Sequence, residues 1–173
     1  EPAPGDPQSF VNRALADLTA TSLERATDRL SVVTETSASA GLERLESVQV
    51  DCIVSDYQMP GMDGLEFLQT VRETDPDLPF ILFTGKGDES IASETISAGG
   101  TDYLQKKTGT EQYDLLANRV ENLVAQYRAE QRAANQERVA TVVREVNQAL
   151  VRASTRDEIE QAVCDILSSS EPY

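Results

Sequence analysis

The chain has 173 residues, with 15 basic and 30 acidic side chains and a net charge of −15. A surface this acidic argues against binding to nucleic acid or to an anionic membrane, because both carry negative charge. The sequence has no histidine, which excludes histidine general bases, histidine metal ligands and phosphohistidine. It also has no apolar stretch that is long enough to span a membrane. We therefore expect a cytoplasmic protein with no nucleic-acid or membrane partner.

The composition also indicates the salt concentration and the redox state of the compartment in which the protein works. Only three basic residues are lysines, and an acidic, lysine-poor surface suits a high-salt cytoplasm in which counterions screen self-repulsion. An ordinary solvated acidic surface is the alternative. Cys52 and Cys164 lie far apart in apolar contexts, which favours buried free thiols in a reducing compartment. The chain does not begin with Met, so we expect a fragment of a longer protein.

The first quarter of the chain predicts one strand between two helices. Residues 1–8 (EPAPGDPQ) are rich in Pro and predict a disordered lead-in. Apolar residues recur at mostly helical spacing over residues 9–29. Residues 31–36 (SVVTET) predict a strand, and residues 40–47 (AGLERLES) predict a short helix.

A buried strand and a tight turn follow. Residues 50–54 form a short apolar run with β-branched members, which is typical of a strand buried on both faces. Asp56 stands where this strand ends, and Pro60-Gly61 then forces a turn. Asp63 is placed to cap the next helix. Asp56 on its own could be a simple turn residue, since Asp is common in turns.

Helices and strands alternate through the next part of the chain. Residues 64–74 predict a helix that Asp75-Pro76 ends, and residues 80–84 (FILFT) predict a fully apolar strand. Residues 89–98 predict a weak helix, and residues 103–106 predict a short strand. This alternation predicts an α/β fold with a parallel, doubly wound sheet and right-handed crossovers.

Three of the predicted strands end in polar side chains, Asp56, Thr84 and Lys106. Because the carboxyl ends of parallel strands meet at one edge of a sheet, we expect these side chains to form a site. Asp56 can act as a carboxylate nucleophile that forms an acyl phosphate. Lys106 offers a cation for phosphate oxygens, and Thr84 offers a hydroxyl donor. Phosphoryl transfer needs mostly positioning and charge neutralisation, so a site this small suffices.

The segment Asp51–Gly64, followed by Thr84 and the Tyr103-x-x-Lys106 spacing, resembles a response-regulator receiver domain. The resemblance covers residues 10–126, and the DxxMPGMDG pattern in its centre is highly specific. It implies a five-stranded flavodoxin-like sheet of order 2-1-3-4-5. The acidic, aromatic-poor style resembles receivers from halophilic archaea.

The resemblance also implies a role for each site residue. Asp56 would be the phosphoacceptor, and Asp56 and the backbone carbonyl of Gln58 would bind Mg²⁺. Thr84 would be the switch hydroxyl, and Lys106 the cation that senses the phosphate. Tyr103 would be the aromatic side chain that moves inward when Thr84 engages the phosphate.

The start of the chain departs from the family pattern. Receivers open with an apolar strand that ends in an acidic pair, and this pair helps to hold Mg²⁺. Residues 5–13 show neither an apolar strand nor an acidic pair, and Asp6 is the nearest candidate ligand. Mg²⁺ binding should be weaker without the pair. The sheet should also lack an interior strand, unless a segment swapped from a second chain replaces it.

The C-terminal part predicts a long helix. No Pro or Gly occurs from Glu111 to about Arg152, and residues 108–111 fit a capping box. Two short heptad seams lie along this helix. Their members are Leu116, Val120, Leu123 and Tyr127, and then Val139, Val143, Val146 and Leu150. We expect Leu116 and Val120 to pack on the receiver's own sheet. The second seam predicts a partner helix, parallel or antiparallel, and hence a homodimer.

A further helix is expected near the end of the chain. Residues 155–158 fit another capping box, and residues 146–167 resemble the opening helices of a GAF sensory domain. The predicted organisation is a lead-in at 1–8, a receiver at 9–126 and a signalling or coiled-coil helix at 127–153. The truncated start of a GAF-like domain follows at 154–173.

We interpret the chain as the phosphoacceptor receiver of a two-component phosphorelay, served by a separate histidine kinase. It would not be an enzyme beyond its own phosphorylation and dephosphorylation. The alternative is a degenerate pseudo-receiver that acts as a phosphorylation-independent dimerisation or interaction module. A haloacid-dehalogenase-type phosphohydrolase would need a second Asp at position 58, where Gln58 stands. The spacing of Gly85-Lys86-Gly87 does not match a P-loop.

Overall fold

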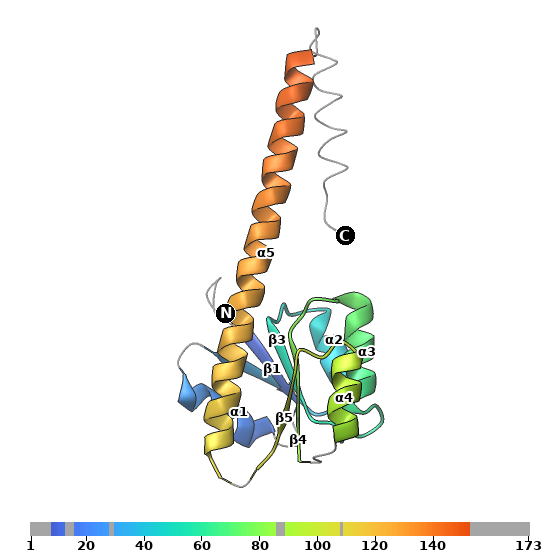
Figure 1. Ribbon diagram of the computed structural model, residues 1–173, viewed down its shortest axis with the longest axis vertical. Coiled ribbons are helices and arrows are strands. Elements are labelled where there is room, and N and C mark those ends of the chain that lie inside the picture. Colours follow the sequence, from blue (N-terminus) through green and yellow to red (C-terminus); the bar gives the residue numbers. More distant parts are fainter. Residues whose placement is uncertain (1–7, 13–15, 28–29, 86–88, 108, 153–173) are drawn as a thin grey trace. The chain divides into compact units, whose positions relative to one another are not determined.

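Five parallel strands form one sheet in the order β2-β1-β3-β4-β5 (Figure 1). The computed structural model describes residues 8–12, 16–27, 30–85, 89–107 and 109–152. The strands are β1 (Gln8–Asn12), β2 (Ser31–Glu35), β3 (Cys52–Ser55), β4 (Phe80–Thr84) and β5 (Asp102–Gln105). The helices are α1 (Ala16–Ala26), α2 (Ala38–Leu45), α3 (Gly64–Thr74), α4 (Glu89–Ser97) and α5 (Glu111–Arg152). The predicted doubly wound α/β fold and its strand order are confirmed.

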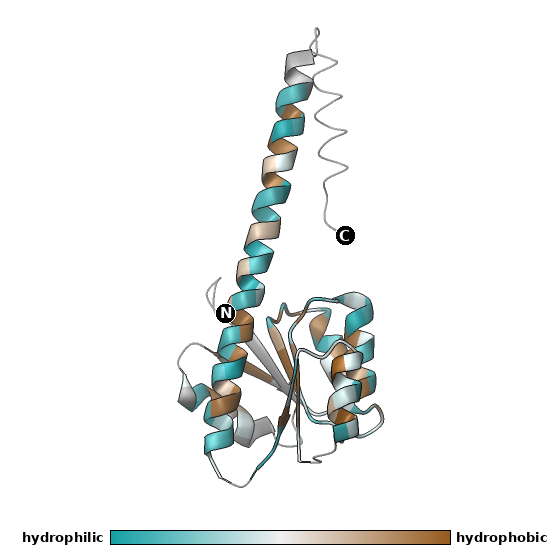
Figure 2. Cartoon of the chain, in the orientation of Figure 1, coloured by the Kyte–Doolittle hydropathy of each residue, from teal (hydrophilic) through white to brown (hydrophobic). Residues whose placement is uncertain are grey.

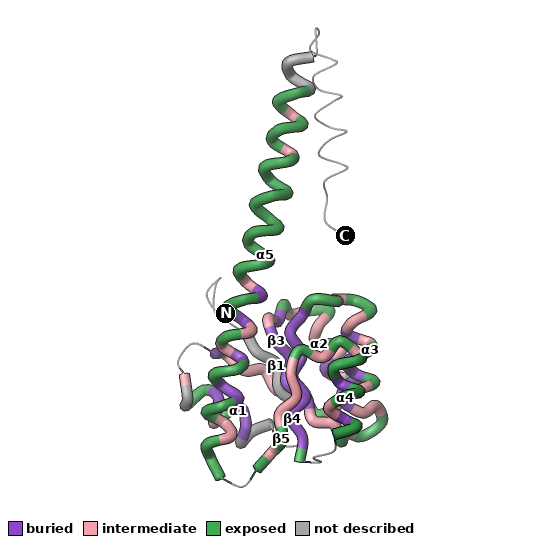
Figure 3. The backbone as a smooth tube through the Cα atoms, viewed as in Figure 1, coloured by how far each residue is buried: buried purple, intermediate pink, exposed green. Residues whose placement is uncertain are grey.

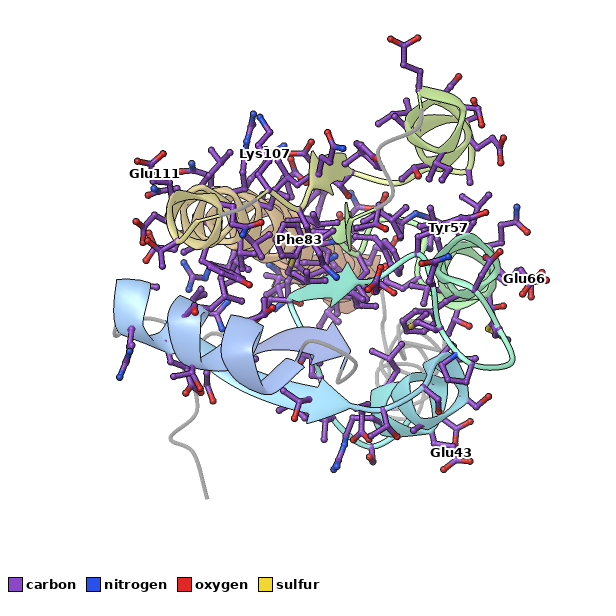
Figure 4. The ribbon with its side chains drawn as sticks, turned by 90° about the horizontal axis from the view of Figure 1, so that it is seen from below. Glu43, Tyr57, Glu66, Phe83, Lys107 and Glu111 are labelled. Atoms are coloured by element: carbon purple, nitrogen blue, oxygen red, sulfur yellow. The ribbon has the colours of Figure 1, made fainter. Side chains whose placement is uncertain are left out.

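The sheet has helices on both faces, α1 and α5 on one and α2, α3 and α4 on the other (Figures 1 and 4). Successive residues of β3 point to opposite faces, so Ile53 packs with the α3 side while Cys52 and Val54 pack with the α5 side. Figure 2 shows apolar residues concentrated in β3 and β4 and on parts of the helices around them. Every residue of β3 and β4 is buried (Figure 3), as expected for strands covered on both sides.

Strand β1 overturns the prediction for the start of the chain. Residues 9–12 were expected to begin a helix and the first strand was expected to be missing. Instead Gln8–Asn12 lies between β2 and β3, with Phe10 opposite both Val33 and Ile53. No swapped segment is needed, and α1 begins only at Ala16. Hydrogen bonds to β2 and β3 satisfy the backbone groups of β1 on both sides. They stabilise this strand although its apolar run is short.

Smaller differences concern the ends of elements. Helix α2 begins at Ala38, earlier than predicted, because the Ser37 side chain accepts a hydrogen bond from the Ala40 N–H at 3.2 Å and caps the helix. Asp63 caps α3 as predicted and forms a full capping box with Glu66. Helix α3, β4 and α5 have the predicted bounds.

The chain divides into two compact units, Glu1–Arg128 and Ala129–Tyr173. The first unit contains the sheet and the first half of α5, where Leu116 and Val120 are fully buried as predicted. In the second unit α5 continues to Arg152. The predicted capping residue Thr108, the cysteine Cys164 and the GAF-like segment at 154–173 lie outside the described residues. Within the described parts of the chain, every helix is too short or too polar to cross a bilayer.

Candidate functional site

Asp56 and Lys106 form an ion pair at the edge of the sheet where the strands end. The Lys106 ammonium Nζ donates to Asp56 Oδ2 at 2.7 Å, and each side chain is only 15% exposed. Asp56 directly follows β3, and Lys106 directly follows β5. A charge-assisted hydrogen bond this short, partly shielded from water, is stronger than an exposed surface pair. The structure therefore brings together two of the three strand-end residues expected to form a site.

Thr84, the third of these residues, ends β4 and is buried. Its backbone carbonyl accepts a hydrogen bond from the Lys106 N–H at 2.8 Å, which extends the β4–β5 ladder to Lys106. The ring of the preceding residue, Phe83, has its centroid 5.4 Å from Lys106 Nζ, within the range of a cation–π contact. The backbone and side chain of Lys106 are thus both placed by the end of β4.

The loop after β3 packs tightly against the start of α3. Gly64 opens α3, and its N–H donates to the Tyr57 carbonyl at 2.9 Å. A Cβ added at Gly64 would lie 2.2 Å from the Asp56 carbonyl oxygen and 2.7 Å from Leu82 Cδ1. Only glycine allows this approach. This packing role of Gly64 was not predicted, although a glycine directly after a helix cap is a signal for close packing.

The remaining predicted site residues lie around this pair. The Gln58 N–H points to Asp56 Oδ1 at a long 3.4 Å. Tyr103 lies on β5 opposite Leu82 and is half-buried against the core on the α3 side. Figure 4 views the molecule from below, with Phe83 and Lys107 on the α5 side and Tyr57 on the α3 side.

The metal ligands were predicted to be Asp56, the Gln58 carbonyl and Asp6. Asp6 lies outside the described residues. Within the described parts, no three Asp, Glu, Cys or His side chains gather in a way that could hold a metal ion. Asp56 and Gln58 still offer two oxygen donors of the kind that Mg²⁺ accepts, and Mg²⁺ usually keeps several waters beside few protein ligands. The donors present therefore fit a Mg²⁺ ion that is held largely by water and phosphate.

A second polar cluster lies at the opposite edge of the sheet and was not predicted. Arg128 Nη2 lies 2.9 Å from Asp51 Oδ2, and the Tyr127 hydroxyl donates to Asp75 Oδ2 at 3.1 Å. Burial, reinforced by the Asp75 carboxylate, raises the pKa of Tyr127 to about 12. Burial also raises the pKa of Cys52, a free thiol in the core next to this cluster. Tyr127 and Arg128 thus bind α5 to the C-terminal cap of α3 and to the start of β3, where the first compact unit ends.

The sequence pattern of the response regulator receiver domain matches residues 12–118, well over half of the chain. The chain is 38% identical over 101 residues to the C4-dicarboxylate transport transcriptional regulatory protein DctD of Rhizobium meliloti, covering 57% of this chain and 22% of DctD. It is 33% identical over 106 residues to the DNA-binding transcriptional regulator NtrC of Escherichia coli, covering 61% of this chain and 22% of NtrC. The chain thus spans about a fifth of the length of these two relatives.

Solved structures share the fold. A response regulator receiver domain protein from Clostridium thermocellum superposes with a TM-score of 0.62 at 22% identity, covering 71% of this chain and 98% of that one. A CheY-like receiver domain protein from Methanospirillum hungatei gives a TM-score of 0.62 at 22% identity, covering 72% and 98%. The beryllofluoride-activated NtrC4 receiver domain dimer gives 0.60 at 23% identity, covering 69% and 98%.

Proposed function

Because the chain belongs to the response-regulator receiver family, we propose that Asp56 accepts a phosphoryl group from a separate histidine kinase. In this transfer the P–N bond of the kinase's phosphohistidine breaks, and a P–O bond to an Asp56 carboxylate oxygen forms. The product is an acyl phosphate. The observation that carries the proposal is the 2.7 Å contact between Lys106 Nζ and Asp56 Oδ2 at the carboxyl edge of the sheet.

Each neighbouring residue has a chemical task in this proposal. Lys106 neutralises charge on the incoming phosphoryl oxygens, which is the main demand of phosphoryl transfer. The Thr84 hydroxyl binds a phosphoryl oxygen once Asp56 is modified. Tyr103 then moves inward on β5, so that phosphorylation selects one of two arrangements of this face.

We further propose that Mg²⁺ assists this reaction, as it generally does in receiver domains. The Asp56 carboxylate and the Gln58 backbone carbonyl would hold the ion, with Asp6 as a further candidate. Bound there, Mg²⁺ supplies positive charge that offsets the negative charge of the phosphoryl group. Because no three carboxylates gather at one place among the described residues, we expect the affinity for Mg²⁺ to be modest.

The output is proposed to run along α5. Val139 and Val143 are 55% and 53% exposed on this helix, one step of a heptad apart, and they would pair with the same helix of a second copy. The segment 129–152 carries four Arg and three Glu, so the chain's strong negative charge does not oppose this pairing. We keep the assignment of 127–153 to a signalling helix and 154–173 to the start of a GAF-like domain as proposals. We also propose that the protein is cytoplasmic.

Intact-mass measurement after incubation with acetyl phosphate and Mg²⁺ tests the central proposal. In this reaction the P–O bond of acetyl phosphate breaks, acetate leaves, and the phosphoryl group moves to Asp56. We expect one added phosphoryl mass in the wild type and none in Asp56→Asn. A second sample with EDTA in place of Mg²⁺ tests the metal, and we expect much slower labelling there.

The pseudo-receiver is the competing outcome of this experiment. A wild-type chain that is folded by circular dichroism but gains no mass at any Mg²⁺ concentration would contradict the phosphoacceptor proposal. The same helix pairing would then have to act without phosphorylation.

A further inference from the structure

A single side chain, Gln112 in the first turn of α5, holds the backbone of the residue that follows Lys106. The Lys107 N–H donates to Gln112 Oε1 at 2.7 Å. Gln112 Nε2 donates back to the Lys107 carbonyl, and it also donates to the Gly109 carbonyl at 2.8 Å. Gly109 has a φ of +115°, which allows the loop to turn into the helix at this point. The Gln112 amide therefore uses both its acceptor and its donors on one loop.

Lys106 is consequently fixed on both sides. Its own N–H donates to the Thr84 carbonyl at 2.8 Å, which ties it to β4. The next residue, Lys107, is tied to α5 through Gln112. Between these anchors the Lys106 side chain reaches Asp56 at 2.7 Å. A long lysine side chain loses much rotamer freedom in such a contact, so a fixed backbone lowers the cost of holding it there.

The first turn of α5 also reaches Lys106 by a second route. The rings of Tyr113 and Phe83 meet edge to face with centroids 6.1 Å apart. The same Phe83 ring lies beneath the Lys106 ammonium, 5.4 Å from its centroid. Two adjacent residues of α5 thus act on either side of Lys106: Gln112 holds the backbone of the next residue, Lys107, and Tyr113 packs on the ring that contacts the Lys106 ammonium group.

We propose that Gln112 is a positioning residue for phosphoryl transfer, acting through Lys106. It holds the loop so that the Lys106 ammonium group stays in contact with Asp56. It also makes the position of that group depend on the start of α5. Glutamine suits this task because one amide both donates and accepts, whereas leucine, similar in size, can do neither. The inference rests on the proposed function of Asp56, and it adds a residue that the sequence analysis did not place in the site.

The test compares Gln112→Leu with Gln131→Leu, the same change at an exposed position further along α5. The rate of labelling by acetyl phosphate at saturating Mg²⁺ should fall about fivefold or more in Gln112→Leu, because loss of positioning slows the reaction. It should not change in Gln131→Leu. Equal rates in the two variants would overturn the proposal.

A double-mutant cycle separates positioning from a general structural effect. If Gln112 acts through Lys106, replacing it in a Lys106→Ala background should change the rate by less than about twofold. An undiminished effect in that background would overturn the proposal, since Gln112 would then act by another route.

A spectroscopic measurement keeps the inference separate from the proposed function. The chain has only three lysines, so a ¹H–¹⁵N correlation of their side-chain ammonium groups is simple, and Lys106→Arg identifies the Lys106 signal. We expect this signal to persist in Gln131→Leu and to weaken or shift in Gln112→Leu. This result is obtained whether or not Asp56 accepts phosphate. A Lys106 signal that is identical in both variants would contradict the proposal that the Gln112 contacts position Lys106.

Discussion

Arg128 binds Asp51 at one end of β3, while Lys106 binds Asp56 at the other. The two contacts measure 2.9 Å and 2.7 Å, and each joins a carboxylate next to β3 with a cation from a later element. The Arg128 and Asp51 side chains are 24% and 14% exposed, so their contact is partly shielded from water. This pair fixes α5 to the sheet at the last residue of the first compact unit.

Replacing Arg128 with alanine should therefore destabilise the fold. The change leaves a largely buried Asp51 carboxylate without this cation, and we expect the free energy of unfolding to fall by about 1–2 kcal/mol. Urea unfolding followed by circular dichroism measures the difference. Arg132→Ala, at an exposed position four residues further along α5, is the control and should change little. Equal midpoints for the two variants would contradict the assigned role of the pair.

Tyr127 predicts a dependence of stability on alkaline pH. A tyrosine in the unfolded chain ionises at about pH 10, whereas the pKa of Tyr127 in the fold is about 12. Between these values the unfolded state binds fewer protons, so the stabilising contribution, complete below pH 10, declines as pH rises toward 12. Unfolding midpoints across this range, compared with Tyr127→Phe, measure the contribution, because the other titrating groups cancel. If the difference in unfolding midpoint between the wild type and Tyr127→Phe stayed constant with pH, the raised pKa of Tyr127 would not contribute to stability.

Gly64→Ala should damage both the fold and the site. Its Cβ would lie 2.2 Å from the Asp56 carbonyl oxygen, so the backbone of Asp56 must move. We expect a loss of about 2 kcal/mol or more, together with slower labelling by acetyl phosphate. Gly85→Ala is the matched control for stability, because a Cβ there meets nothing within 4 Å. If both substitutions were tolerated equally, the close packing at Gly64 would be disproved.

The proposed pairing of α5 predicts a change in assembly. Val143→Lys places a charge in the seam of the proposed dimer, whereas Thr141→Lys places the same charge on another side of the helix. Sedimentation analysis should give a dimer for the wild type and for Thr141→Lys, and a monomer for Val143→Lys. A wild-type chain that sediments as a monomer would count against the pairing. So would a Val143→Lys variant that still dimerises.

The charge of −15 predicts that salt stabilises the protein. Counterions screen the repulsion among acidic side chains, so the melting temperature should rise from low to molar concentrations of KCl. A melting temperature that is flat or that falls over this range would remove the argument for a high-salt environment.

Asp56 and Thr84 were predictable as strand-end residues because one follows and the other ends a clear apolar strand, β3 and β4. Parallel pairing then places Asp56 and Lys106 at one edge, whatever the details of packing. Strand β1 was missed because Phe10 and Val11 also fit the helical spacing of the apolar residues after them. Whether these residues form a strand or a helix is decided by their pairing with β2 and β3, which the local sequence does not encode.

Contacts between distant side chains were beyond prediction for a different reason. Arg128 and Asp51 are 77 positions apart, and their meeting depends on the rotation of α5 about its axis. The Gln112 contacts depend on the path of a short loop and on one rotamer. Such features follow from the assembled packing, and hydrophobic periodicity does not encode them.

Locating the phosphoryl group tests the central claim most directly, since the chain has 30 acidic side chains and a mass gain alone does not say which one reacts. Borohydride reduces an acyl phosphate on aspartate to homoserine, which peptide sequencing by mass spectrometry identifies. After treatment with acetyl phosphate and Mg²⁺, we predict homoserine at position 56 and nowhere else. Homoserine at another position, or none in a protein that has gained phosphoryl mass, would contradict Asp56 as the phosphoacceptor.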